Sequence, residues 1–364
     1  MSDLITEHVG KPTCSRLRQF LPKLTRLFLP LDLTRALLEY DATTHFLARK
    51  RVPPTFKVIR HILNVVTTNA IAGKLKLLTL GADDTIYEDG ESINKSSKIV
   101  QIDVELIRRG IVVSLLTAAC YPGNPSRYEQ SLCVILEALA DLTIKELPRF
   151  LVMGGECNYR FETYTDTISG IVGLREIDGA IWKAGQRAIG IINTSNKRFF
   201  YENLEEISIT LQHQLRHFHV PFYAFNGGND VWINIKHKAL GIQDLQKYVF
   251  RFLPLELRGS EEMRNIQVHE CLLVGDRFTI TGNKTLSRDV AATIWVSNPQ
   301  ETGCVMSILL QAIDLEHQQK REQNAEKEQE RENKDWKAEA NATDTTQISD
   351  DESDNSFDTW AGAY

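Results

Sequence analysis

The chain has 364 residues, a length that can hold one large α/β domain and a smaller one, and its 42% hydrophobic and 25% charged residues are typical of a soluble globular protein. With 42 basic and 48 acidic residues its net charge is −6, which argues against general nucleic-acid binding and against attachment to an anionic membrane. No stretch reads as a membrane span or a signal peptide, so we expect a cytoplasmic protein. Six cysteines without a CxxC pair predict free thiols.

Residues 1–66 predict a helical region. The first helix has an apolar face formed by Leu17, Leu21, Leu24 and Phe28. A second helix is predicted for residues 32–51, ending at a Val-Pro-Pro sequence, and a third for residues 56–66.

The central stretch is LKLLTLGADDTIYEDG, residues 75–90. Its apolar half, bounded by glycines, predicts a buried strand. The loop that follows carries four acidic residues: Asp83, Asp84, Glu88 and Asp89. Carboxylates at the carboxyl end of a buried strand are typical of active sites in doubly wound α/β sheets, and a solvated acidic turn is the alternative.

Strands followed by polar loops recur along the chain. The predicted strands are 111–116, 150–153, 223–225, 272–274 and 293–296. Helices are predicted between them at 99–109, 128–142 and 301–315. This alternation indicates an α/β fold with a doubly wound, Rossmann-type parallel sheet, whose core comprises residues 67–156 and 221–315.

Residues 157–220 interrupt the alternation with a short strand at 188–192 and a helix at 204–218. We interpret them as an inserted cap, which in enzymes closes over the substrate. From residue 316 to residue 364 the sequence becomes highly charged. Its first part is compatible with an extension of the last helix, and its end, ISDDESDNSFDTWAGAY, predicts disorder.

Several strings, MGGE, GGNDVW, VGD and SNPQET, occur in this order after LGADDTIYEDG. Together they resemble the IMP-specific 5'-nucleotidases, haloacid-dehalogenase-like phosphatases of fungi and apicomplexan parasites. The resemblance extends from about Pro53 to Thr302. It implies a haloacid-dehalogenase-like fold and the Mg²⁺-dependent hydrolysis of IMP to inosine and phosphate.

The resemblance also implies roles for individual residues. Asp83 matches the general acid/base, and Asp83 with Asp276 matches carboxylates that hold magnesium. Residues matching substrate contacts are Asp83, Asp89, Thr117, Asp230 and Lys238. His61 matches a histidine that contacts a regulatory nucleotide, so ATP is an expected effector, and the N-terminal helices are expected to build oligomer contacts. A solvated or packed histidine is the alternative for His61.

This chain departs from the family pattern at four positions. Gly81 stands where the family has its nucleophilic aspartate, and the following Thr-Ile-Tyr sequence fixes this register. Asn226, Asn234 and Lys284 also replace aspartates. Because a glycine cannot supply an attacking carboxylate, the resemblance predicts a nucleotide-binding but catalytically impaired relative.

Three functional classes stay open at this stage. The first is an active IMP 5'-nucleotidase in which the motif register differs from the one given above or water attacks directly. The second is a pseudoenzyme that senses a purine monophosphate, in homo- or hetero-oligomers. The third is an interaction protein that makes its contacts through the charged tail.

Overall fold

The computed structural model describes residues 2–21, 24, 26–49, 52–88, 91–121, 124–177, 188–194, 197, 199–218, 222–235, 237–250, 265–279 and 281–347. The chain divides into two compact units, Met1–Ile313 and Asp314–Tyr364. The first unit contains both β-sheets and the candidate site.

The N-terminal region is helical, as predicted, but its helices are shorter and more numerous. They are α1 (Ser2–Gly10), α2 (Arg16–Phe20), α3 (Leu33–Thr44), the 3-10 helix η1 (Phe46–Ala48) and α4 (Phe56–Ile71). The apolar face predicted as far as Phe28 is therefore wrong beyond Phe20. Pro22 explains the early end, because proline lacks the N–H that a continuing helix needs. By contrast, α4 continues five residues past the predicted end.

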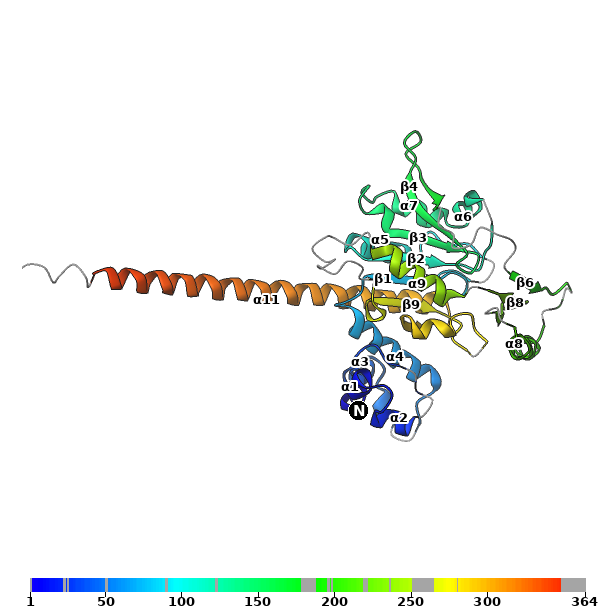
Figure 1. Ribbon diagram of the computed structural model, residues 1–364, viewed down its shortest axis with the longest axis horizontal. Helices are drawn as coiled ribbons and strands as arrows, with labels where there is room; N and C mark the ends of the chain where they lie inside the picture. The colour runs from blue at the N-terminus through cyan, green and yellow to red at the C-terminus, as the bar shows by residue number, and fades with distance from the viewer. Residues whose placement is uncertain are drawn as a thin grey trace, which may run out of the picture. The chain divides into compact units, whose positions relative to one another are not determined.

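The large sheet has seven strands in the order β10-β9-β1-β2-β3-β4-β5 (Figure 1). Their bounds are β1 (Leu77–Gly81), β2 (Val112–Leu116), β3 (Phe150–Gly154), β4 (Tyr159–Thr165), β5 (Val172–Glu176), β9 (Cys271–Gly275) and β10 (Ala292–Trp295). Neighbours are parallel from β10 through β3, whereas β4 and β5 are antiparallel. The doubly wound α/β fold is confirmed, with an antiparallel hairpin added at one edge.

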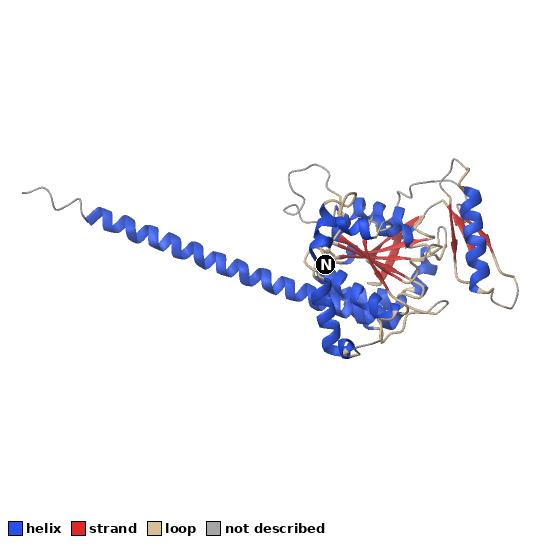
Figure 2. Cartoon of the chain, turned by 90° about the horizontal axis from the view of Figure 1, so that it is seen from below, coloured by secondary structure: helices blue, strands red, loops and turns tan. Residues whose placement is uncertain are grey.

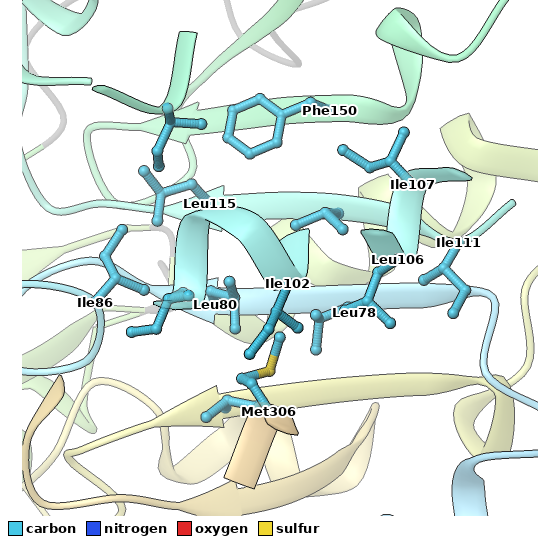
Figure 3. Packing of buried hydrophobic residues seen from close by; sticks show 14 of the residues in the cluster. Leu78, Leu80, Ile86, Ile102, Leu106, Ile107, Ile111, Leu115, Phe150 and Met306 are labelled. Atoms are coloured by element: carbon cyan, nitrogen blue, oxygen red, sulfur yellow. The ribbon is translucent and has the colours of Figure 1, made fainter. Parts of the chain in front are cut away.

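Helices cover both faces of this sheet. The elements not yet named are α5 (Lys98–Arg108), α6 (Pro125–Ser131), α7 (Cys133–Leu139), η2 (Leu147–Arg149), α9 (Lys238–Val249), η4 (Val268–Glu270) and η5 (Thr285–Asp289). On one face α5, α7 and the start of the last helix share one apolar cluster, in which Leu78, Leu80, Ile102 and Met306 pack together (Figure 3). On the other face, α9 forms a second cluster around Leu77 and Leu273.

Three further strands form a second, smaller sheet, which Figure 2 shows as a separate group of strands beside one helix. It has the order β6-β8-β7, with β6 (Ala188–Ile191), β7 (Tyr223–Asn226) and β8 (Val231–Asn234). Helix α8 (Tyr201–Leu215) packs against it.

The boundaries of the predicted cap differ from this arrangement at both ends. Residues 157–176 contribute β4 and β5 to the large sheet, and residues 223–225 pair in the small sheet instead of returning to the core. The physical reason is pairing: β7 hydrogen-bonds to β8, which follows it after a tight glycine loop, so the hairpin stays together.

The last helix, α11, spans Pro299–Gln347. Its first part packs in the core through Val305, Met306, Leu309 and Ile313. The second unit is helical from Asp314 to Gln347, in agreement with the predicted helical extension; residues 348–364, predicted to be disordered, lie outside the described residues. Within the described residues, no helix is long and apolar enough to cross a membrane.

Candidate functional site

The carboxyl ends of β1 and β9 meet at a pocket of about 80 Å³. These strands are parallel neighbours paired from Leu77 with Cys271 to Leu80 with Val274, so the loops that follow them emerge side by side. The pocket is lined by Asp83, Ala118, Phe225, Gly227, Trp232, Lys238, Asp276, Arg277, Asn283 and Lys284. The fold thus brings together three residues predicted from sequence, Asp83, Lys238 and Asp276.

Lys284 is the centre of this site. Its side chain is 2% exposed, its Nζ donates to Asp276 Oδ1, and the same Nζ lies 3.5 Å from Thr85 Oγ1. Burial lowers the pKa of Lys284 to about 8, and Lys238 adds to this shift while Asp276 opposes it. Burial alone would raise the pKa of Asp276, but Lys284 and Arg277 together bring it below its ordinary value. The pair is therefore an ammonium and a carboxylate at neutral pH.

Two glycines make room for the lysine stem. A Cβ placed on Gly81 would lie 2.6 Å from Lys284 Nζ, and a Cβ on Gly275 would lie 2.8 Å from Lys284 Cε. Real Cβ atoms do not approach other atoms so closely. The lysine side chain therefore runs between the ends of β1 and β9 because both strands end in glycine.

The donor set at this position does not fit magnesium. Among the described residues, no group of three or more histidine, cysteine, aspartate or glutamate side chains is arranged to hold a metal ion. An ammonium already bonds to the Asp276 oxygen that would be a metal ligand. A divalent ion about 4 Å from that ammonium would be repelled by roughly 8 kcal/mol at an effective dielectric constant of about 20, before solvent relaxes.

Arg277 connects three loops around the pocket. Its guanidinium lies 3.2 Å from Asp276 Oδ2 and 3.4 Å from Asp84 Oδ2, on the loops after β9 and β1. It also donates to the carbonyl of Asn226, 3.2 Å away, at the end of β7 in the small sheet. The loop between β7 and β8 passes close to Arg277, since a Cβ on Gly228 would lie 2.8 Å from the Arg277 guanidinium. One cation therefore joins the core loops to the small sheet.

A buried carboxylate supports the other side of the pocket. Glu156 lies 4.0 Å from Lys238 Nζ, and the same oxygen accepts a hydrogen bond of 3.0 Å from Asn283 Nδ2. Glu156 and Cys157 both have left-handed backbone angles, φ 51° and 68°, which are unfavourable for residues other than glycine. This strained turn after β3 aims Glu156 at the amine of Lys238.

Other predicted residues lie around the pocket rather than in its lining. Thr117 directly follows β2; its buried hydroxyl accepts from the amide of Ala119, 3.0 Å away. Asp230, in the loop between β7 and β8, accepts a hydrogen bond of 2.7 Å from the amide of Asn193, which follows β6. Asn226 holds its own loop, since its amide oxygen accepts from Gly228. Asp89 lies outside the described residues.

Comparison with known proteins identifies the family. The family model described as IMP-specific 5'-nucleotidase matches residues 1–186 and 176–306. IMP-specific 5'-nucleotidase 1 of Yarrowia lipolytica is 32% identical over 349 residues, covering 84% of this chain and 80% of the relative. The Plasmodium falciparum relative is 28% identical over 356 residues, covering 85% and 76%. The chain belongs to the IMP-specific 5'-nucleotidase family.

Solved structures of the Plasmodium falciparum IMP-nucleotidase agree with this assignment. An IMP-bound, N-terminally truncated form matches with a TM-score of 0.74 and 26% identity over 85% of this chain and 88% of that one. An ATP-bound form matches with a TM-score of 0.70 and 27% identity over 85% and 77%. The fold of this family member matches that of the Plasmodium falciparum IMP-nucleotidase, and the small sheet and α8 are inserted in its α/β core.

His61 lies outside the pocket lining in this nucleotidase-family chain. Its Nε2 is 3.3 Å from Glu301 Oε1, and Arg60 Nη2 contacts the same carboxylate at 2.8 Å. Burial lowers the pKa of His61, and Glu301 opposes the shift only in part. Arg60 and His61 therefore attach α4 to the start of α11 through Glu301.

Sequence reasoning did not single out Arg277, Trp232 or Glu156 as site residues. Trp232 and Glu156 stood inside the family-like strings GGNDVW and MGGE, and Arg277 directly follows VGD, so position beside a predicted site residue was the available signal. No sequence rule distinguishes an arginine that spans three loops from an exposed one, because its partners are far away along the chain.

Proposed function

We propose that this chain binds IMP, the nucleotide of its family, and that its own hydrolytic activity is impaired. The observation that carries the proposal is Gly81 at the end of β1, packed against the Lys284 ammonium. The family resemblance assigns the attacking carboxylate to this position, where the chain has only backbone.

No second carboxylate in the described lining is free to replace it. The lining carboxylates are Asp83 and Asp276, and Asp276 bonds to Lys284. Asp83 matches the acid/base of the family and would have to serve in two roles. Loss of a catalytic nucleophile costs on the order of 10⁶ in turnover, or about 8 kcal/mol of barrier, so residual activity should be very low.

Nucleotide binding is supported by the charge of the pocket and by the relatives. Three cations, Lys238, Arg277 and Lys284, line it together with two carboxylates. Phe225 and Trp232 offer aromatic faces beside these charges, which suits a purine ring attached to a phosphate. The Plasmodium falciparum relative has been solved with IMP bound. Asp83, Asp89, Thr117, Asp230 and Lys238 are the proposed substrate contacts.

The test is phosphate release from IMP with magnesium, in parallel with calorimetric titration of IMP. We expect IMP to bind while phosphate release stays far below the range of ordinary enzymes. Turnover above about 1 s⁻¹ that is abolished by Asp83→Asn would refute the impairment. It would also favour the second candidate, an active IMP 5'-nucleotidase, to which the retained Asp83 and Lys238 in one pocket lend support.

The same proposal includes regulation and assembly. ATP is the proposed effector because a related structure contains ATP, and the N-terminal helices are the proposed contacts of a homo- or hetero-oligomer. A cytoplasmic location completes it. Light scattering of the purified chain with and without ATP tests the assembly, and a change in mass on adding ATP is the expected result.

A further inference from the structure

Lys284 occupies the place that a bound cation would take. The atoms around its Nζ are oxygens, Asp276 Oδ1 and Thr85 Oγ1, which are the kind of donors a hard metal ion prefers. Unlike a metal ion, this cation is covalently attached and cannot dissociate. Its side chain is almost fully buried, so its position is determined by packing and not by a flexible surface stem.

The surroundings of the lysine form a built site. The stem passes between Gly81 and Gly275, and any larger residue at either strand end would collide with it. Thr85 also contacts Asp276, at 3.3 Å, so the carboxylate is held from two sides. Arg277 contacts the other oxygen of Asp276 at 3.2 Å. Both oxygens of Asp276 thus already have cationic partners, and neither is free to coordinate a metal ion.

From this geometry we infer that Lys284 is a permanent replacement for the divalent metal of the site. The chain binds the phosphate of a nucleoside monophosphate through Lys284, Lys238 and Arg277, without a metal ion. For its ligand, the inference rests on the proposed binding of IMP. For the exclusion of metal it rests on the geometry alone.

The first experiment uses Mn²⁺ alone, followed by electron paramagnetic resonance of the free ion. We expect the wild-type chain to bind no Mn²⁺ at the pocket. The double variant Gly81→Asp/Lys284→Asp should bind one ion more, because removal of the lysine relieves the contacts that an aspartate at position 81 would otherwise make. Lys247→Asp, at an exposed position on α9, is the matched control for an added acid. Wild-type binding of one Mn²⁺ as tight as that of the double variant overturns the inference.

The second experiment titrates IMP calorimetrically in EDTA and in magnesium, and does not depend on the double variant folding. Wild type should bind equally in both buffers. Lys284→Met, which keeps the length of the side chain and removes its charge, should weaken binding about tenfold or more in EDTA, as expected for loss of a charged hydrogen bond. Lys247→Met should bind like wild type.

The outcomes separate the two proposals. IMP binding that requires magnesium, or Lys284→Met that binds as well as wild type, overturns the inference and leaves the proposed nucleotide binding in place. Absence of IMP binding in both buffers refutes the proposed function, and the Mn²⁺ experiment then decides the metal-exclusion claim independently.

Discussion

Asp103 gives the sharpest stability prediction, because its carboxyl group is buried without a hydrogen-bond partner among the described residues. It lies on α5 with 1% of its surface exposed, and neither oxygen has a hydrogen-bond partner among the described residues. Burial raises the pKa of Asp103 well above its ordinary value. A neutral but unsatisfied polar group costs about 1–3 kcal/mol, so Asp103→Leu should stabilise the fold by a similar amount.

The effect should depend on pH in a defined direction. The folded chain keeps the proton on Asp103, whereas the unfolded chain loses it above its ordinary pKa of about 4. The unfolded state therefore binds fewer protons, and stability falls as pH rises from that value through the raised pKa. Asp103→Leu should consequently stabilise more at pH 8 than at pH 4.

Urea unfolding of wild type and Asp103→Leu at both pH values measures this difference. Asp103→Asn is a useful companion, because it removes the ionisation while keeping the shape and an unsatisfied polar group. Asp141→Asn, at an exposed position, is the control and should change little. A gain for Asp103→Leu that is the same at both pH values, or a loss at pH 8, would refute the reasoning.

Three further predictions concern packing and ion pairs in the first unit. Gly154→Ala places a Cβ about 2.6 Å from Cζ of the buried Tyr128, and should destabilise the fold by about 1–3 kcal/mol in thermal unfolding; an unchanged melting temperature would contradict the packing. Arg60→Met removes the main partner of the buried Glu301 and should lower the free energy of unfolding in urea by about 3 kcal/mol. A decrease under about 0.5 kcal/mol would show that the pair behaves as a surface contact. Arg277→Met removes the link between core loops and small sheet, so amides of residues 226–228 should exchange hydrogen faster, whereas unchanged exchange would show that the link is dispensable.

The sequence was most informative where short-range patterns decide structure. The apolar run before Gly81 became β1, and Asp83 and Asp276 came together because parallel strands share their carboxyl edge. It failed at β7, because a three-residue apolar run fits either sheet until its partner β8 is known. The contact of His61 with Glu301 could not be predicted either, because the two residues are far apart in the sequence.

The two departures from the family at Gly81 and Lys284 are best understood as one structural change. An aspartate at position 81 would collide with the lysine at position 284 in its present conformation, because the Cβ alone would meet Nζ at 2.6 Å, so the end of the lysine would have to shift. The lysine in turn supplies, together with Arg277, the positive charge that lets Asp276 remain ionised when buried. Reverting either position alone should therefore lower the stability of the fold. Gly81→Asp would overpack the site, and Lys284→Asp would place two carboxylates together without the lysine cation that now contacts Asp276. If the proposed function holds, a pocket with a glycine and a lysine at these positions keeps its affinity for phosphate while lacking the group that would attack it.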